Sequence, residues 1–141
     1  MPKVRFVKSY PLFLLLRSYP LSTCCVVLIW VLSLTPWFPE TPLSDISFID
    51  KYTHFIMYGG TAAVMWCEHL WHSKKKARRP NLRALWLVAL AGLIALGGLM
   101  ELLQAYATTT RSGEWLDFWA DSLGAALGCG LGNLVYHINA R

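Results

Sequence analysis

Long apolar stretches that are nearly free of charge constrain this chain more than any other feature. Of its 141 residues, 55% are hydrophobic and 15% are charged, whereas a soluble domain carries about 25% charged residues. A helix that crosses a bilayer needs about 20 mostly apolar residues, and we predict helices near that length over 19–35, 51–71, 84–107 and 115–138. The predicted fold is therefore all-α, a four-helix transmembrane bundle.

The basic residues predict how such a bundle is oriented. They gather at Lys3, Arg5, Lys8 and Arg17, at Lys74, Lys75, Lys76, Arg78, Arg79 and Arg83, and at Arg141. Segments of this kind remain in the cytoplasm, so both termini are predicted to be cytoplasmic. We divide the chain into a basic lead (1–18), the membrane domain (19–138) and a short tail (139–141). The alternation with apolar stretches argues against nucleic acid as a partner, despite the net charge of +5.

A first group of polar residues lies around the turn between the last two predicted helices. Glu101 and Gln104 are near the end of one helix, Asp117 and Asp121 are near the start of the next, and Arg111 lies between them. Glu101 and Asp121 are each about 9 Å inside a helix end, at 1.5 Å per residue. Ionisable groups inside apolar helices are costly and often functional. We therefore expect the Glu101 and Asp121 carboxyls to lie close together in the outer half of the bundle.

A second polar group opens the predicted helix over 51–71. Asp50, His54 and Tyr58 recur at intervals of four and share one helix face. Lys51 lies beside Asp50 and is, with Arg111, one of two basic residues outside the cytoplasmic segments. A helix cap at Asp50 with an interfacial histidine is the simpler explanation. The alternative places His54 and Arg111 at the mouth of a pocket that also contains the carboxyls.

The two groups together suggest a site whose chemistry the residue types leave open. One hypothesis makes the carboxyls and the histidine general acids and bases, around an anionic lipid headgroup that the cations hold. The candidate catalytic residues are Asp50, His54, Glu101, Asp117 and Asp121, and the candidate substrate-binding residues are Lys51, Tyr58, Gln104 and Arg111.

Two other hypotheses use the same residues differently. An oxygen-rich metal site of the Mg, Mn or Zn type would use Glu101, Asp117, Asp121 and His54. No HExxH motif supports it and none of the four cysteines has metal-site spacing, so we assign no metal ligand and leave the cofactor unknown. Alternatively, the charges form a hydrogen-bonded network that only holds the helices together.

A glycine ridge continues the polar stripe along the last predicted helix. Gly124, Gly128 and Gly132 follow Asp117 and Asp121 at successive steps of four residues, apart from the single three-residue step into Gly124. Small residues let membrane helices approach closely. We therefore predict that another helix packs against this ridge, directly below the polar site.

These motifs resemble the VanZ-like family over roughly residues 44–132. The resemblance is carried by Asp50-Lys51-x-x-His54-Phe55-x-x-Tyr58, by Glu101-x-x-Gln104, and by Arg111, Asp117, Asp121, Gly124 and Gly128. Asp121 stands where members of the family commonly have Asn, and the turn before Arg111 is a residue longer than usual. The resemblance implies a small multi-pass protein of the bacterial cytoplasmic (inner) membrane.

The function implied by the resemblance concerns the cell envelope. The family's namesake is associated with resistance to teicoplanin, a lipid-tailed glycopeptide that acts at the outer membrane surface. We expect an outward-facing pocket that affects lipoglycopeptide susceptibility, or that binds or modifies an envelope lipid or wall precursor. Membrane lipids are expected partners, and the oligomeric state is left open. The alternatives are a non-catalytic structural or partner-binding protein and a small intramembrane enzyme acting on a lipid-linked phosphate or peptide.

Overall fold

The computed structural model describes residues 16–35, 48–109 and 113–140. Regular structure in these residues is helical throughout: α2 (Pro20–Leu34), α3 (Ile49–Lys75), α4 (Leu82–Trp86), a π-helical turn η1 (Leu87–Ala91), α5 (Gly92–Ala107) and α6 (Trp115–Asn139). The predicted all-α fold is confirmed for this part of the chain, and the four predicted helices differ from the observed helical segments by a few residues at most. Most of the predicted basic lead lies outside the described residues.

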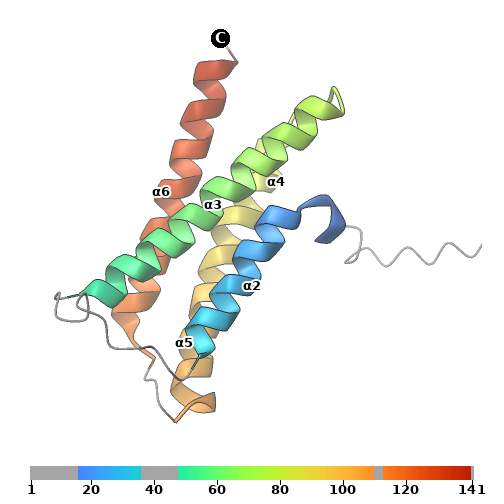
Figure 1. Cartoon of the computed structure of the whole chain (residues 1–141). Coiled ribbons are helices and arrows are strands. Elements are labelled where there is room, and N and C mark those ends of the chain that lie inside the picture. The colour runs from blue at the N-terminus through green and yellow to red at the C-terminus, as the bar shows by residue number, and fades with distance from the viewer. Residues whose placement is uncertain (1–15, 36–47, 110–112, 141) are drawn as a thin grey trace, which may run out of the picture.

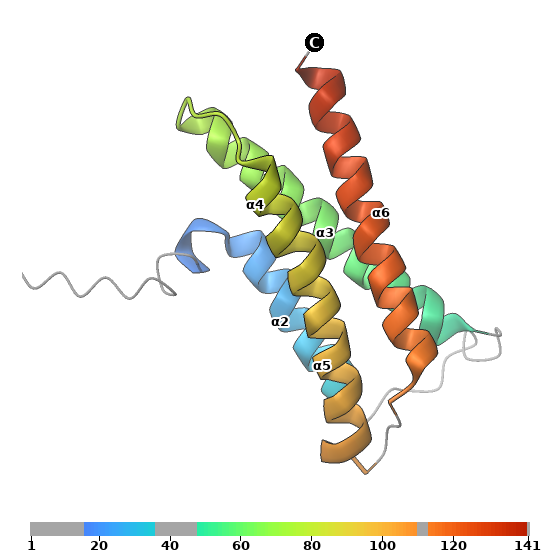
Figure 2. The ribbon, with the colours of Figure 1, turned by 180° about the vertical axis from the view of Figure 1, so that it is seen from behind.

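The helical segments alternate in direction, so the described part of the molecule has two distinct ends (Figures 1 and 2). One end gathers the end of α2, the start of α3, the end of α5 and the start of α6. The other carries the turn between α3 and α4 together with the end of α6. α3 and α6 are the most closely packed pair, and α5 packs on α6 while α2 packs on both α3 and α5.

The predicted glycine ridge packs on α3, as expected. A Cβ atom added to Gly124 would collide with the carbonyl oxygen of Phe55, and one added to Gly128 would collide with that of Gly59. At Gly132, an added Cβ would lie 2.5 Å from the ring of the fully buried Trp66. The backbones of α3 and α6 therefore approach so closely along the ridge that a residue larger than glycine does not fit.

The start of α3 corrects one detail of the prediction. Asp50 was expected to cap this helix, but it lies inside the first turn, and no described side chain caps the N-terminus. The helix begins two residues earlier than predicted, at Ile49, after Phe48 in a left-handed conformation (φ 63°). The Asp50 carboxylate instead bonds the Lys51 ammonium. An acidic group in the first turn still interacts favourably with the helix dipole.

α3 extends past the predicted end at residue 71 into the basic segment. Lys74 and Lys75 occupy its last turn, where positive charge favours the helix dipole. The amide of Arg78 donates to the carbonyl of Ser73 at 3.0 Å, and that of Ala77 donates to Lys74 at 3.1 Å. This pair of bonds is a Schellman motif, which requires a left-handed residue that is usually glycine. Here the position is occupied by Ala77, with φ 49°.

Replacing Ala77 with glycine is therefore expected to stabilise the protein. A left-handed conformation costs an L-residue about 1 kcal/mol, which glycine avoids. The gain should be visible as a higher midpoint of denaturant-induced unfolding in detergent. Ala63→Gly, in the middle of α3, is the control and should lower the midpoint because glycine weakens a helix interior. An unchanged or lower midpoint for Ala77→Gly would contradict the observed conformation.

Helical length and apolar character support membrane association for one segment in particular. Among the described residues, the continuous helical run Leu82–Ala107 is long and apolar enough to cross a membrane, and α2 is a shorter apolar helix. α3 and α6 are long enough, but their polar residues lower their average apolar character. Length and composition alone therefore identify one of the four predicted spans.

Candidate functional site

A buried contact between a histidine of α3 and a carboxyl of α6 lies at the centre of the polar cluster. His54 Nδ1 is 2.9 Å from Asp121 Oδ1, and both side chains are almost fully buried. His54 was expected at the mouth of a pocket, but it is enclosed between carboxyls. Its position follows from the close approach of α3 and α6 along the glycine ridge, because Gly124 lies one turn beyond Asp121.

α5 approaches the same point through Gly97, one of the three glycines in its predicted helix. A Cβ atom added to Gly97 would lie 2.9 Å from Asp121 Oδ2. Glu101 is one helical turn further along α5, on the face that Gly97 presents. The absence of a side chain at Gly97 thus allows Asp121 of α6 to pack against the backbone of α5. Because Asp121 also contacts His54 of α3, the three helices meet at this point.

Glu101 enters the cluster from α5 and borders both His54 and Asp117. One ligand atom from each of these three side chains lies within 4.8 Å of the other two. Glu101 Oε2 accepts a hydrogen bond from the backbone amide of Glu114 at 2.7 Å. Oε1 is buried and has no hydrogen-bond partner among the described residues. Glu101 and Asp121 are thus both neighbours of His54, and a close approach of their two carboxyls remains a prediction.

Lys51 connects the cluster to the surface. Its ammonium lies 2.5 Å from Asp50, 2.5 Å from Glu114 and 3.1 Å from the buried Asp117. Glu114 was not among the predicted site residues, although it immediately precedes α6, where an acidic side chain is favoured. That position is the signal that would have identified it. The Lys51 ammonium therefore neutralises carboxylates of the protein itself and is not free for a ligand.

The remaining predicted site residues have different positions. Tyr58 is fully buried one turn below His54, and its hydroxyl has no hydrogen-bond partner within the described ranges. The amide of Gln104 donates to the carbonyl oxygen of Ser33 at 2.9 Å, which ties α5 to α2. Its role in substrate binding remains a prediction. Arg111 lies outside the described residues.

The charges of the cluster are strongly unbalanced. Glu101, Asp117 and Asp121 are three buried carboxyls. Among the described residues of the cluster, Lys51 is the one permanently charged cation, and Asp50, Glu114 and Asp117 share it. Poorly solvated carboxylates need a nearby positive charge or a proton. The arrangement is therefore suited to binding a cation or to exchanging protons.

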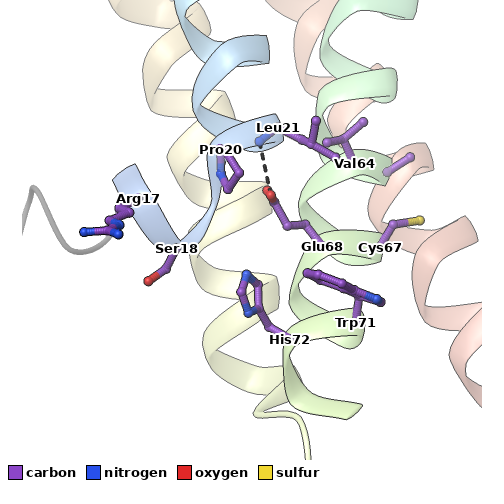
Figure 3. A pocket seen from close by; sticks show the side chains of 10 residues that line it. Arg17, Ser18, Pro20, Leu21, Val64, Cys67, Glu68, Trp71 and His72 are labelled. Atoms are coloured by element: carbon purple, nitrogen blue, oxygen red, sulfur yellow. Dashed lines mark hydrogen bonds between the residues drawn. The ribbon is translucent and has the colours of Figure 1, made fainter. Parts of the chain in front are cut away.

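The opposite end of the bundle contains a buried carboxyl with a structural role. Glu68 of α3 accepts a hydrogen bond from the amide of Leu21 at 3.1 Å (Figure 3). It also accepts hydrogen bonds from the amide and the hydroxyl of Ser22, at 2.9 and 2.6 Å. These amides belong to the first turn of α2, whose orphan donors require acceptors. A largely apolar cavity of about 680 Å³ borders Glu68. Glu68 is fully occupied by capping α2, so the polar cluster at the other end remains the candidate site.

The cluster combines a histidine, several carboxyls, an ammonium and a phenol near one end of α3, α5 and α6. These groups can transfer protons, bind a cation or hold an anion beside Lys51. No protein-family model, curated protein or solved structure matches the chain in the comparisons made.

Proposed function

We propose that this protein is a multi-pass protein of the bacterial cytoplasmic membrane, of the VanZ-like kind, whose polar cluster faces outward. There the cluster binds or modifies an anionic component of the envelope, a lipid headgroup or a wall precursor. Through that component the protein lowers susceptibility to lipoglycopeptides. If the protein only binds this component, it is a binding protein. If it also changes the component chemically, it is a small intramembrane enzyme.

Apolar side chains on the outside of the described helices support the membrane placement. Leu123, Leu127 and Leu131 form an exposed stripe along α6, and α2 and α5 expose further large apolar residues. A soluble monomer rarely exposes an apolar surface of this extent, whereas lipid tails solvate it. The exposed lysines and arginines of residues 74–83 gather at one end, and the polar cluster lies at the other.

One observation carries the proposal: a charged, buried cluster joins α3, α5 and α6 near one end of an otherwise apolar bundle. Ionisable groups in such surroundings are costly and mark functional sites in membrane proteins. Lys51 supplies a positive charge at the surface side of the cluster. An anionic headgroup would bind Lys51 in competition with Asp50 and Glu114, whose side chains are more exposed than that of Lys51, with Asp117, Glu101 and His54 buried below.

The membrane orientation is tested by reporter fusions. Fusions after His72 and after Arg141 are expected to report the cytoplasm, and fusions after Asp45 and after Ser112 the opposite side. The reason is the confinement of basic residues to one set of segments. A fusion at Lys76 that reports the outer side would contradict the outward placement of the cluster.

Glu101→Gln tests whether the cluster acts on a ligand. The change keeps the shape of the side chain and removes its charge, so we expect a normal folded yield in detergent. Wild-type protein should gain thermal stability from anionic lipid phosphate or wall precursor in the micelle, and the variant should lose most of that gain. Glu68→Gln is the matched control, because Glu68 is a buried carboxyl on α3 at the other end, and it should keep the gain.

A non-catalytic protein is the second candidate, and specific contacts favour it. Glu101 holds the segment before α6, and Lys51 of α3 bonds Glu114 and Asp117 across the helix junction. Such contacts stabilise helix packing without any ligand. If Glu101→Gln lowers the folded yield and no anionic lipid stabilises the wild type, the cluster acts as a structural lock and the binding proposal is wrong.

A further inference from the structure

Two groups of potential metal ligands lie side by side in the cluster, and they differ in how closely the Lys51 ammonium contacts their members. Asp50, Glu114 and Asp117 form one group, and His54, Glu101 and Asp117 form the other. The Lys51 ammonium lies within 3.1 Å of a carboxylate oxygen of each member of the first group. That group therefore already holds a cation. In the second group Lys51 contacts only the shared member Asp117, and Glu101 has no cation beside it among the described residues.

We propose that His54, Glu101 and Asp117 bind a divalent transition-metal ion such as Zn²⁺ or Mn²⁺, and that Asp121 orients the histidine. The inference deepens the function proposed above, because the ion would occupy the same cluster. It rests on the positions and charges of these four side chains, which come from three different helices.

The spacing of the three ligand atoms suits a single ion. They lie within 4.8 Å of one another. Two ligands on opposite sides of an ion, each about 2.1 Å from it, are about 4.2 Å apart. Small side-chain rotations therefore bring all three atoms within bonding distance.

The His54–Asp121 contact is the kind that supports a metal-binding histidine. Such histidines usually donate the hydrogen of one ring nitrogen to a carboxylate, which orients the ring for the metal. Here Nδ1 is 2.9 Å from Asp121 Oδ1, so a metal ion would bind the other ring nitrogen, Nε2. Asp121 is fully buried, so its hydrogen bond to the imidazole is shielded from competing water.

A free carboxylate oxygen points to an absent binding partner. Glu101 is nine-tenths buried, and its Oε1 has no hydrogen-bond partner among the described residues. Leaving a buried charged acceptor unsatisfied is costly. A metal ion beside Glu101 and Asp117 would satisfy this oxygen and balance the two carboxylate charges.

The donor set selects the class of metal. One imidazole with two carboxylates favours Zn²⁺ or Mn²⁺ over Ca²⁺, which prefers six or more oxygens. Three protein ligands leave at least one coordination position open. An oxygen of a phosphate or carboxylate headgroup would fit that position, with Lys51 beside it as a second positive charge.

Metal content is the direct test. Full-length protein is purified in detergent, stripped with a chelator, dialysed against Zn²⁺, Mn²⁺ or Mg²⁺ without added lipid, and analysed by mass spectrometry. We expect about one Zn²⁺ or Mn²⁺ per chain, with at least tenfold weaker binding in Glu101→Gln and His54→Gln. Asp121→Asn should weaken binding 10- to 100-fold, as loss of an orienting partner does. Glu68→Gln should bind like the wild type.

The variants are compared only as folded protein, checked by size exclusion and circular dichroism. Glu101→Asp, which keeps the charge but shortens the side chain, serves if Glu101→Gln fails to fold. A folded wild type that retains no ion, or a folded Glu101 variant that binds as tightly as the wild type, overturns the metal site. The lipid-dependent thermal shift is measured on separate samples with chelator present and absent. A shift that persists in chelator preserves the headgroup proposal even if the metal proposal fails.

Discussion

Replacing Gly128 with leucine is expected to separate α6 from α3 and to cause a large loss of stability. The first added carbon alone would collide with the carbonyl oxygen of Gly59 and lie 2.8 Å from the side chain of Ala62. Both obstacles belong to the helix, so neither can rotate away. Overpacking a tight core costs about 1–3 kcal/mol, and we expect about 3 kcal/mol here because backbone must move. The midpoint of unfolding in mixed detergent measures it.

Gly130→Leu is the matched control for this prediction. Gly130 lies on the same helix two residues away, and an added Cβ there meets no atom within 4 Å. The two substitutions change helix propensity equally, so their difference isolates the packing against α3. Equal midpoints for the two variants would mean that α3 and α6 do not meet at the ridge.

His54→Phe is expected to destabilise the protein by about 3 kcal/mol, since removing one partner leaves an uncompensated buried charge. Asp121 is fully buried, and His54 is the one described side chain that hydrogen-bonds its carboxylate. Phenylalanine fills the space of the imidazole ring but cannot donate a hydrogen bond to Asp121. The free energy of unfolding, measured in the same detergent as the wild type, provides the test.

A double-mutant cycle with Asp121→Asn separates the buried charge from other effects of the substitution. Asparagine keeps the shape of Asp121 against Gly97 and removes its charge. In the His54→Phe background this second change should therefore cost less than it does alone, with a coupling of about 2 kcal/mol. If the two costs simply add, the contact between His54 and Asp121 does not stabilise the fold.

The helices were predictable from the sequence because local features define them. Pro20 begins α2, the basic segment ends α3, and the polar residues around 108–114 separate α5 from α6. Apolar runs bounded by such residues have few alternatives to a helix. The ridge of Gly124, Gly128 and Gly132 was also predictable, because its four-residue spacing puts small residues on one helix face.

Membership of the polar cluster was predictable only in part. The spacing of Asp50, His54 and Tyr58 indicates a shared face but says nothing of what that face meets. Glu114 and Gly97 were missed because one is a loop residue and the other is a glycine among several. Gln104 has the same local features as Glu101, yet it bonds the carbonyl of Ser33 on α2.

The sequence by itself determined where helices form, which segments carry positive charge and which faces are smooth, because these depend on residues close together in the chain. Only the tertiary structure decided how charges are paired. Lys51 meets Glu114 and Asp117, and His54 meets Asp121, across more than 60 residues of sequence. These pairings depend on how closely α3 approaches α6 and on the space at Gly97, which lets the Asp121 side chain pack against α5. Such distances arise from packing between helices, which no local pattern specifies.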